Sequence, residues 1–370
     1  MSGQTTLRAN PFTPVFGKVP PYLAGRTSII EDMLQALDAG SGDPNLCSVF
    51  TGARGTGKTA LLTYLGDEAR RLGWIVADVT AAPGMLDEIL QCVQGAGAHL
   101  LEPEPSRKLT GVGIAPLGSV TWSNTGTSYA TWRLHMNDLF SQLEATGTGI
   151  LITVDELDPS LDEMTQLVTV YQHFVREGRK AALIMAGLPH RVSGLLSGRS
   201  TSFLRRAAQH KLGSIPAFEV KEAFRLTVRE GGRDIGGNAL ERAAGEIDGF
   251  PFMFQLLGYR AWNAAAGNAC ITEDDIEFGA RLAREELRSR VFDATFAELS
   301  KGDVSFLQAM ALDDGPSARA DVTQRLGRSS SYISTYKKRL LEAGVIEEPF
   351  SGTFTFALPG FRDYIRDMTA

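Results

Sequence analysis

A ten-residue stretch near the front of the chain has residue types and spacing that suit phosphate binding. Residues 51–60 read Thr-Gly-Ala-Arg-Gly-Thr-Gly-Lys-Thr-Ala, which satisfies the pattern G-x-x-x-x-G-K-[ST]. Its glycines let backbone N–H groups surround an anion, and Lys58 can reach the β- and γ-phosphates. The Thr59 hydroxyl can ligate Mg²⁺. The predicted nucleotide contacts in this phosphate loop are Gly52, Ala53, Arg54, Gly55, Thr56, Gly57, Lys58, Thr59 and Ala60.

Two adjacent carboxylates could complete the chemistry. Residues 149–154 form a nearly continuous apolar run, and Asp155 and Glu156 follow at its end. Asp155 can hold Mg²⁺ through water, and Glu156 can polarise the water that attacks the γ-phosphate. An apolar strand that ends in acidic residues is common in proteins, so this motif by itself is weak evidence for a nucleotide site. Its position about a hundred residues after the phosphate loop makes the evidence strong.

Two arginines, Arg205 and Arg206, lie between the last two predicted strands. An arginine here could reach the γ-phosphate of a neighbouring subunit. The alternative is a solvated basic helix end, and the sequence does not decide between the two.

Alternating strands and helices must position these groups. Residues 46–50 precede the phosphate loop as an apolar run of strand length, and a helical pattern follows it. The pattern predicts an α/β fold: a parallel sheet with helices on both faces and ligands at the carboxyl ends of the strands. The predicted strands are residues 46–50, 74–79, 149–155, 181–187 and 211–215.

Residues 102–127 interrupt this pattern and are rich in Gly, Pro, Ser and Thr. Residues 109–115 and 119–122 could pair as a hairpin. Two interpretations stay open: a solvent-exposed insertion without a special role, or a hairpin that contacts a partner or DNA.

The remaining chain predicts two further parts. Residues 218–299 contain only helical patterns and predict a helical lid. After residue 300, helix-turn-helix spacing and two short strands predict a winged helix, whose second helix spans residues 330–343. Basic residues (Arg328, Lys337, Lys338 and Arg339) give that helix local positive charge. The predicted DNA contacts are Arg328, Ser330, Ser331, Ser334, Thr335 and Lys338.

Composition limits the classes of protein to which this chain can belong. The 370 residues carry a net charge of −6, so any DNA contact must come from a local patch. Three scattered cysteines indicate neither a disulfide framework nor a zinc site. Neither a signal peptide nor a membrane-spanning run is present, so we expect a cytoplasmic protein without a membrane partner.

Together these residues resemble the AAA+ and STAND class of P-loop ATPases, in particular the replication-initiator (origin-recognition-like) and archaeal-type branch. The resemblance runs from about residue 11 to the C-terminus and implies ATP as the nucleotide. It places Leu23, Gly25 and Arg26 in an N-terminal box beside the adenine, and Arg205 or Arg206 where the arginine finger is found. The implied domains are an arm (1–27), an ATPase core (28–216), a helical lid (217–300) and a winged-helix domain (301–370).

Two departures from that family bear on activity. The fourth strand ends in Ala186-Gly187, where many members have a polar sensor. The turn at residues 249–252 lacks the lid arginine and resembles the Gly-x-Pro turn of STAND switches, in which Pro251 would pack near the nucleotide. Both missing groups would stabilise charge developing at the γ-phosphate. We therefore expect slow ATP hydrolysis, by a switch more than a motor.

Two functions fit these features. The first is an ATP-controlled binder of double-stranded DNA that could self-associate through its ATP sites. The second is a STAND-like signalling or defence ATPase, whose winged helix contacts a protein partner and not DNA. A small-molecule kinase fits less well, because no acid–base set for a substrate is evident.

Overall fold

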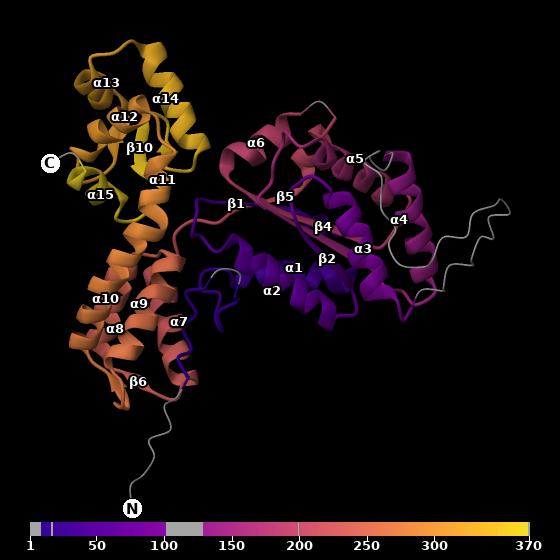
Figure 1. The fold of residues 1–370 in the computed structure, drawn as a ribbon, viewed down its shortest axis with the longest axis horizontal. Helices are drawn as coiled ribbons and strands as arrows, with labels where there is room; N and C mark the ends of the chain where they lie inside the picture. The colour runs from indigo at the N-terminus through magenta and orange to yellow at the C-terminus, as the bar shows by residue number, and fades with distance from the viewer. Residues whose placement is uncertain (1–8, 16–17, 101–128, 199, 369–370) are drawn as a thin grey trace, which may run out of the picture.

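The structure is a computed structural model that describes residues 9–15, 18–100, 129–198 and 200–368. The predicted insertion at residues 102–127 and its hairpin lie outside these ranges. Figure 1 shows an α/β core on one side, and a helical lid and a C-terminal domain stacked along the other. Within the described ranges, no helix has both the length and the apolar character that a membrane span requires.

A five-stranded sheet forms the centre of the core. β1 (Cys47–Thr51) lies between β4 (Ala181–Gly187) and β5 (Ala208–Lys211), and β3 (Ile150–Asp155) lies between β4 and β2 (Ile75–Thr80). All four pairings are parallel. The phosphate loop after β1 and the acidic pair at the end of β3 therefore lie at the same edge of the sheet.

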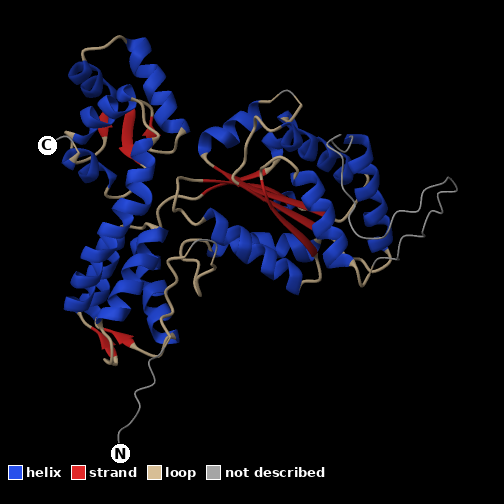
Figure 2. Cartoon of the chain, viewed as in Figure 1, coloured by secondary structure: helices blue, strands red, loops and turns tan. Residues whose placement is uncertain are grey.

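Helices cover both faces of this sheet (Figure 2). Side chains of β1 alternate between the two layers: Val49 packs in one apolar cluster and Phe50 in the other, and both are fully buried. The predicted α/β fold is confirmed. The helices are α1 (Thr27–Ala39) and α2 (Lys58–Arg71) on the Phe50 side, and α3 (Met85–Gly97), α4 (Tyr129–Glu144), α5 (Asp162–Arg176) and α6 (Pro189–Ser197) on the Val49 side.

The fifth strand lies earlier than predicted. β5 spans Ala208–Lys211, and the prediction of a strand at residues 211–215 is wrong. The Leu212 N–H still donates to the Thr51 carbonyl at 2.7 Å, but the Ile215 N–H donates to the Gly249 carbonyl at 2.8 Å. The apolar residues at 212 and 215 are therefore buried where the chain leaves the sheet for the lid.

The lid contains four main helices and one short strand pair. Its helices are α7 (Ala217–Glu230), α8 (Gly237–Ile247), α9 (Pro251–Ala264) and α10 (Glu273–Leu287). β6 (Asp234–Ile235) pairs in parallel with β7 (Cys270–Ile271), so the prediction of an all-helical lid is wrong in this detail. Strands of two residues are too short to produce an alternating pattern in the sequence.

The N-terminal arm packs into the lid. Phe12 is buried, with its ring centroid 5.0 Å from that of Phe224 and 5.9 Å from that of Phe254. A Cβ at Gly258 would lie 2.1 Å from the Phe12 ring, so α9 needs a glycine there. The arm is thus held by aromatic packing to helices more than 200 residues later.

A single turn of π-helix, η3 (Arg288–Phe292), called the π-turn below, links α10 to α11 (Asp293–Ala297). The helical chain continues without a break from α10 through η3 into α11. Phe292 and Phe296 pack on Tyr364 of the C-terminal domain at ring-centroid distances of 5.5 and 5.8 Å. The junction therefore belongs to both the lid and the C-terminal domain.

The C-terminal domain has the element order expected of a winged helix. Ser329 caps α14 through its hydroxyl, which accepts the Tyr332 N–H, and Ile333 and Leu340 are the buried residues of this helix. α15 was not predicted. The elements are α12 (Lys301–Ala311), β8 (Ser317–Ala318), α13 (Arg319–Leu326), α14 (Ser330–Glu342), β9 (Ile346–Phe350), β10 (Thr353–Phe356) and α15 (Phe361–Asp367), with the strands in antiparallel order β8-β10-β9.

Candidate functional site

The phosphate loop lies between the end of β1 and the start of α2, the arrangement that its sequence predicts. Gly55 and Gly57 adopt left-handed backbone conformations, with φ of 78° and 88°. A Cβ at Gly52 would lie 2.6 Å from the Thr56 hydroxyl and 2.8 Å from the Leu212 carbonyl. The loop conformation thus requires glycine at these three positions.

Lys58 lies at the first residue of α2 and is buried. Its ammonium group donates to the carbonyls of Gly52 at 3.0 Å and Ala53 at 2.9 Å. Burial lowers the pKa of Lys58, and the nearby carboxylates of Glu156 and Asp155 oppose that shift. The lysine is therefore held inside the loop, near the two acids predicted to act with it.

The Thr59 hydroxyl donates to a carboxylate oxygen of Asp155 at 2.5 Å. The other Asp155 oxygen accepts the Glu156 N–H at 2.8 Å. Both Thr59 and Asp155 supply hard oxygen donors, which Mg²⁺ prefers. Among the described residues no group of three or more His, Cys, Asp or Glu side chains could hold a metal, so a Mg²⁺ ion here would need phosphate and water ligands as well.

Glu156 has a strained backbone and an exposed side chain. Its φ of 54° places a non-glycine residue in the left-handed region, a conformation that clusters at functional sites. The Arg191 guanidinium donates to the Glu156 carbonyl at 3.2 Å and to the Leu157 carbonyl at 3.3 Å. Arg191, from α6, thus braces the turn that presents Glu156, a contact that the sequence did not reveal.

A cavity of about 480 Å³ lies over the phosphate loop. Its size is that of ordinary small-molecule sites, roughly 300–1,000 Å³. The structure brings together most of the predicted nucleotide contacts, but Gly25, Gly52, Ala53 and Asp155 do not line the cavity. The predicted residues that do line it are Leu23, Arg26, Arg54, Gly55, Thr56, Gly57, Lys58, Thr59, Ala60, Glu156 and Pro251.

Arg26 braces the loop from the N-terminal side. The side chain is buried, and its guanidinium donates to the carbonyls of Thr56 at 3.3 Å and Gly213 at 2.9 Å. Burial lowers its pKa, and Glu219 opposes that shift. These bonds tie the predicted N-terminal box to both the phosphate loop and the chain after β5.

The lid contacts the loop directly. A Cβ at Gly55 would lie 2.6 Å from the Phe250 ring, and one at Gly57 would lie 4.0 Å from Pro251. Pro251 was predicted from the sequence, but the other lining residues of the lid and arm were not, because they reach the loop only through long-range contacts. The missed lining residues are Thr13, Pro14, Val15, Lys18, Pro20, Tyr22, Ala24, Ile215, Phe252, Phe254, Gln255, Arg290, Val291 and Ala294.

Arg205 and Arg206 lie apart from the cavity. Both are exposed in η2 (Ser202–Arg206), and neither lines the cavity of this chain. The Arg205 side chain donates to the Leu196 carbonyl at 3.0 Å. Their predicted action on a neighbouring subunit stays a prediction.

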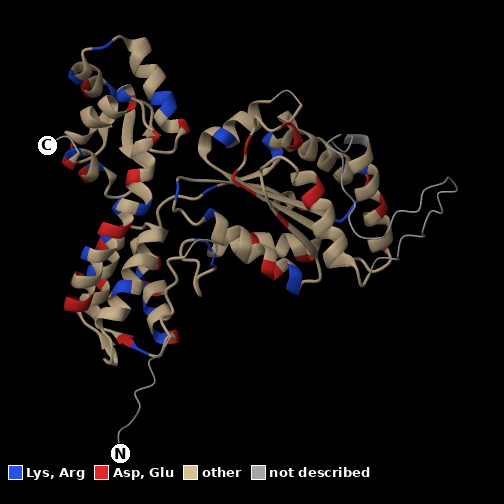
Figure 3. Cartoon of the chain, in the orientation of Figure 1, with Lys and Arg blue, Asp and Glu red and all other residues tan. Residues whose placement is uncertain are grey.

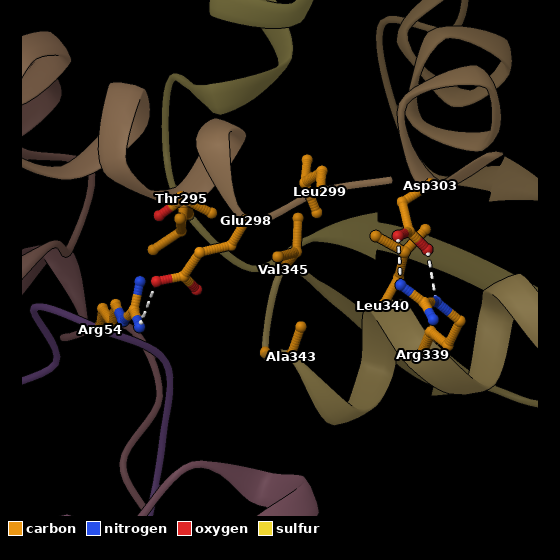
Figure 4. Close-up of a pocket in the computed structure, with 11 residues that line it drawn as sticks. Arg54, Thr295, Glu298, Leu299, Asp303, Arg339, Leu340, Ala343 and Val345 are labelled. Carbon is orange, nitrogen blue, oxygen red and sulfur yellow. Dashed lines mark hydrogen bonds and ion pairs between the residues drawn. The ribbon is translucent and has the colours of Figure 1, made fainter. Parts of the chain in front are cut away.

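A second cavity, about 110 Å³, lies where the C-terminal domain meets the phosphate loop (Figure 4). Arg54 of the loop pairs with Glu298 at 3.0 Å, and Arg339 of α14 pairs with Asp303 at 2.9 Å. A Cβ at Gly344, just after α14, would lie 3.6 Å from the Ala53 Cα. The base of α14 is therefore packed against the loop itself.

The predicted DNA-contact residues are exposed on the outer part of α14 and the turn before it. Arg319, which sequence reasoning missed, donates to the hydroxyls of Ser330 at 3.3 Å and Ser334 at 3.0 Å. The predicted positive charge is smaller than expected, because Lys337 pairs with Glu348 at 2.9 Å, Arg339 with Asp303 at 2.9 Å and Lys338 with Glu342 at 3.7 Å. Figure 3 shows that both basic and acidic residues lie on the C-terminal domain. Of the predicted contacts, Arg328 and Lys338 supply the charge, beside the exposed Ser331 and Thr335.

Similarity to known proteins comes from one family model and from solved structures. A search of curated sequences finds no match. A family model described as "Domain of unknown function (DUF8462)" matches residues 289–365. A Walker-type ATPase of Pyrococcus abyssi superposes with a TM-score of 0.66 at 15% identity, over 92% of this chain and 95% of that one.

The ORC2 protein of Aeropyrum pernix, solved in ADPNP–ADP complexes, gives a TM-score of 0.62 at 17% identity, over 96% of this chain and 98% of that one. Its ADP form gives 0.55 at 17% identity, over 96% of both chains. The predicted resemblance is thus confirmed at the level of the fold. Over nearly its whole length, this chain has the fold of the Walker-type ATPase and of the archaeal ORC2 protein.

Proposed function

We propose that this chain binds ATP and Mg²⁺ at the phosphate loop and hydrolyses the ATP slowly. One observation carries the proposal: Lys58, Thr59 and Glu156 converge from two strand ends on one cavity that residues of the lid also line. The ORC2 structure that shares this fold was solved with ADPNP and ADP. The charge of the cavity suits an anionic nucleotide, since only one of the lining residues, Glu156, is acidic and five are Lys or Arg.

Each residue has a distinct role in this proposal. Lys58 would leave the two loop carbonyls for the phosphates, and Thr59 with Asp155 would hold Mg²⁺. The ion would neutralise charge on the phosphate oxygens. Glu156, on its strained turn, would polarise the attacking water.

Slow hydrolysis has structural support at the end of β4. A Cβ at Gly187 would lie 2.8 Å from the Leu157 Cβ, so this position cannot carry a polar side chain without rearrangement. The group that would stabilise developing γ-phosphate charge from this strand is therefore missing. Steady-state turnover of the isolated protein tests the proposal. A rate on the order of tens per second, as in vigorous phosphoryl-transfer enzymes, contradicts it.

We also propose that the nucleotide state controls how the C-terminal domain binds double-stranded DNA. The contact of Gly344 with Ala53 joins α14 to the phosphate loop, so a change in the loop on ATP binding would reach this helix. ATP can shift this equilibrium only through a different affinity for the two arrangements. The exposed Arg328 and Lys338 would contact DNA phosphates.

DNA binding by the full chain, measured at two salt concentrations with ATP and with ADP, tests this second proposal. We expect ATP and ADP to give different affinities and Lys338→Glu to weaken binding. The matched control is Lys301→Glu on α12, an exposed lysine outside the predicted DNA contacts.

A protein partner for the C-terminal domain is the second candidate function. The neutralised Lys337 and Arg339, and the exposed Phe350 at the hairpin tip, favour it. No binding to any duplex at low salt would support this candidate against the first.

A further inference from the structure

The junction between lid and C-terminal domain carries an arginine that faces the nucleotide cavity. Arg290 lies in the π-turn η3, and it lines the 480 Å³ cavity together with Lys58 and Thr59 of the phosphate loop. π-turns inside helices are rare and are frequent at functional sites. Val291 and Ala294, on the same helical stretch, also line the cavity. The junction thus forms one wall of the proposed ATP site.

The present bonds of Arg290 are weak and replaceable. Its guanidinium donates to the Pro14 carbonyl at 3.3 Å and pairs with Glu286 at 3.0 Å, and about half of the side chain is exposed. Water screens this pair on its Arg290 side, whereas Glu286 is mostly buried, with 17% of its side chain exposed. Glu286 also pairs with Arg260, so it keeps a cationic partner if Arg290 turns toward a ligand. If Arg290 moves, the Glu286 carboxylate therefore still has Arg260 as an ion-pair partner.

Arg290 also complements the other cations of the cavity. Lys58 and Arg54 come from the phosphate loop, whereas Arg290 comes from the junction after α10. A guanidinium can bind phosphate oxygens through two parallel N–H donors, a strong and directional contact. A polyphosphate in the cavity would then be held by cations from two separate parts of the chain.

The same turn is built into the C-terminal domain. Phe292 is buried against Phe361 at a ring-centroid distance of 5.2 Å, and the Tyr364 hydroxyl donates to Asp293 at 2.7 Å. Arg288, two residues before Arg290, pairs with Asp367 at 3.1 Å. The matched family domain begins at residue 289, inside this turn. Arg290 is therefore linked to the C-terminal domain, because Phe292 and Asp293 in the same helical stretch contact Phe361 and Tyr364 of that domain.

We propose that Arg290 is a phosphate-contacting residue through which the C-terminal domain takes part in binding ATP. The inference rests on the proposed ATP site and adds a residue and a physical link to it. Occupancy of the cavity would draw the π-turn toward the phosphates, and Phe292 and Asp293 would pass that shift to the C-terminal domain.

The test measures the ATP dissociation constant of the full-length protein with a fluorescent ATP analogue, in the presence of Mg²⁺. Arg290→Ala should weaken binding about 10-fold, the loss of one charge-assisted contact. Arg290→Lys should keep part of the ATP affinity, because the lysine ammonium still provides a positive point charge. The matched control is Arg281→Ala, an exposed arginine on α10 that does not line the cavity, and it should leave binding unchanged.

Melting temperature without nucleotide provides a second measurement. It should be the same for the wild type, Arg290→Ala and Arg281→Ala, because exposed substitutions usually change stability by less than about 0.5 kcal/mol. Equal ATP affinity for the wild type and Arg290→Ala, with binding lost in Lys58→Ala, overturns this inference and leaves the proposed ATP site standing. A wild-type protein that binds no ATP overturns both.

Discussion

The Arg54 guanidinium lies 3.0 Å from the Glu298 carboxylate and joins the phosphate loop to the segment that leads into the C-terminal domain. The two residues are 244 positions apart in the chain. Both side chains are substantially exposed, 45% and 63%, so the pair adds little to stability. Its position matters more than its strength, because it connects the proposed nucleotide site with the domain proposed to respond to it.

Glu298→Gln should loosen this connection. We expect faster amide hydrogen exchange in residues 293–301 and a smaller difference between the DNA affinities measured with ATP and ADP. The free energy of unfolding should change by less than about 1 kcal/mol, as for other exposed ion pairs. Glu241→Gln is the control, since Glu241 pairs with Lys221 at 2.9 Å inside the lid. Unchanged exchange in the junction would show that the pair does not restrain it.

Lys58→Ala should remove the principal phosphate ligand. We expect ATP affinity to fall about 100-fold, equivalent to roughly 3 kcal/mol, because a buried cation that would bind phosphate is lost. Isothermal titration calorimetry with ATP and Mg²⁺ measures the change. Lys221→Ala removes a half-buried lysine of the lid that does not line the cavity, and this variant should bind ATP like the wild type. Full affinity in Lys58→Ala would place the nucleotide elsewhere.

Glu156→Gln should separate binding from hydrolysis. The amide has nearly the same shape as the carboxylate but cannot polarise water as a base. Turnover should therefore fall by roughly 10²–10⁴ while ATP affinity is kept. Phosphate release in single-turnover experiments checks this, with Glu144→Gln, an exposed residue of α4, as control. Wild-type turnover in Glu156→Gln would refute the assignment of this residue as the base.

Gly258→Ala should displace the N-terminal arm from the lid. The new methyl group would lie 2.1 Å from the Phe12 ring, and overpacking of this kind costs about 1–3 kcal/mol. We expect a lower urea midpoint and faster proteolysis after the arm is released. Gly245→Ala in α8 is the control, because a Cβ there meets nothing within 4 Å. Equal stability of the two variants would mean that Phe12 does not hold the arm.

The Asp313–Arg325 pair should make the C-terminal domain sensitive to acid. Two hydrogen bonds of 2.6 Å from the Arg325 guanidinium lower the pKa of Asp313 to about 2. A lowered folded-state pKa stabilises the fold above the unfolded value, about 3.9, and this contribution is lost as pH falls through about 2.

Asp313→Asn should therefore be less stable than the wild type at pH 5, and the difference in urea midpoint should shrink between about pH 4 and pH 2. Asp363→Asn, on an exposed carboxylate of α15, is the control and should show a smaller difference. A difference for Asp313→Asn that does not depend on pH would show that the pair acts through packing alone.

Local sequence was enough to predict the parts of the site that are contiguous in the chain. The phosphate loop needs glycines at fixed positions and a lysine at the start of a helix, and those requirements are written in residues 51–60. β4 was predicted with its observed bounds because a buried parallel strand is apolar throughout. The strand ending in Asp155 was recognisable for the same reason.

Only the tertiary structure decided which distant residues complete the cavity. Nothing in the pattern around Arg290 or Glu298 distinguishes them from other charged residues of a helix, because their roles come from the path of the chain through the lid. The fifth strand was misplaced because Leu212 and Ile215 are buried by the lid connection, and burial alone does not tell strand from loop. The charge on α14 was overestimated because the acids that neutralise Lys337 and Arg339 come from β9 and α12. Sequence spacing determined the chemistry of the loop, and long-range packing determined which other groups can reach it.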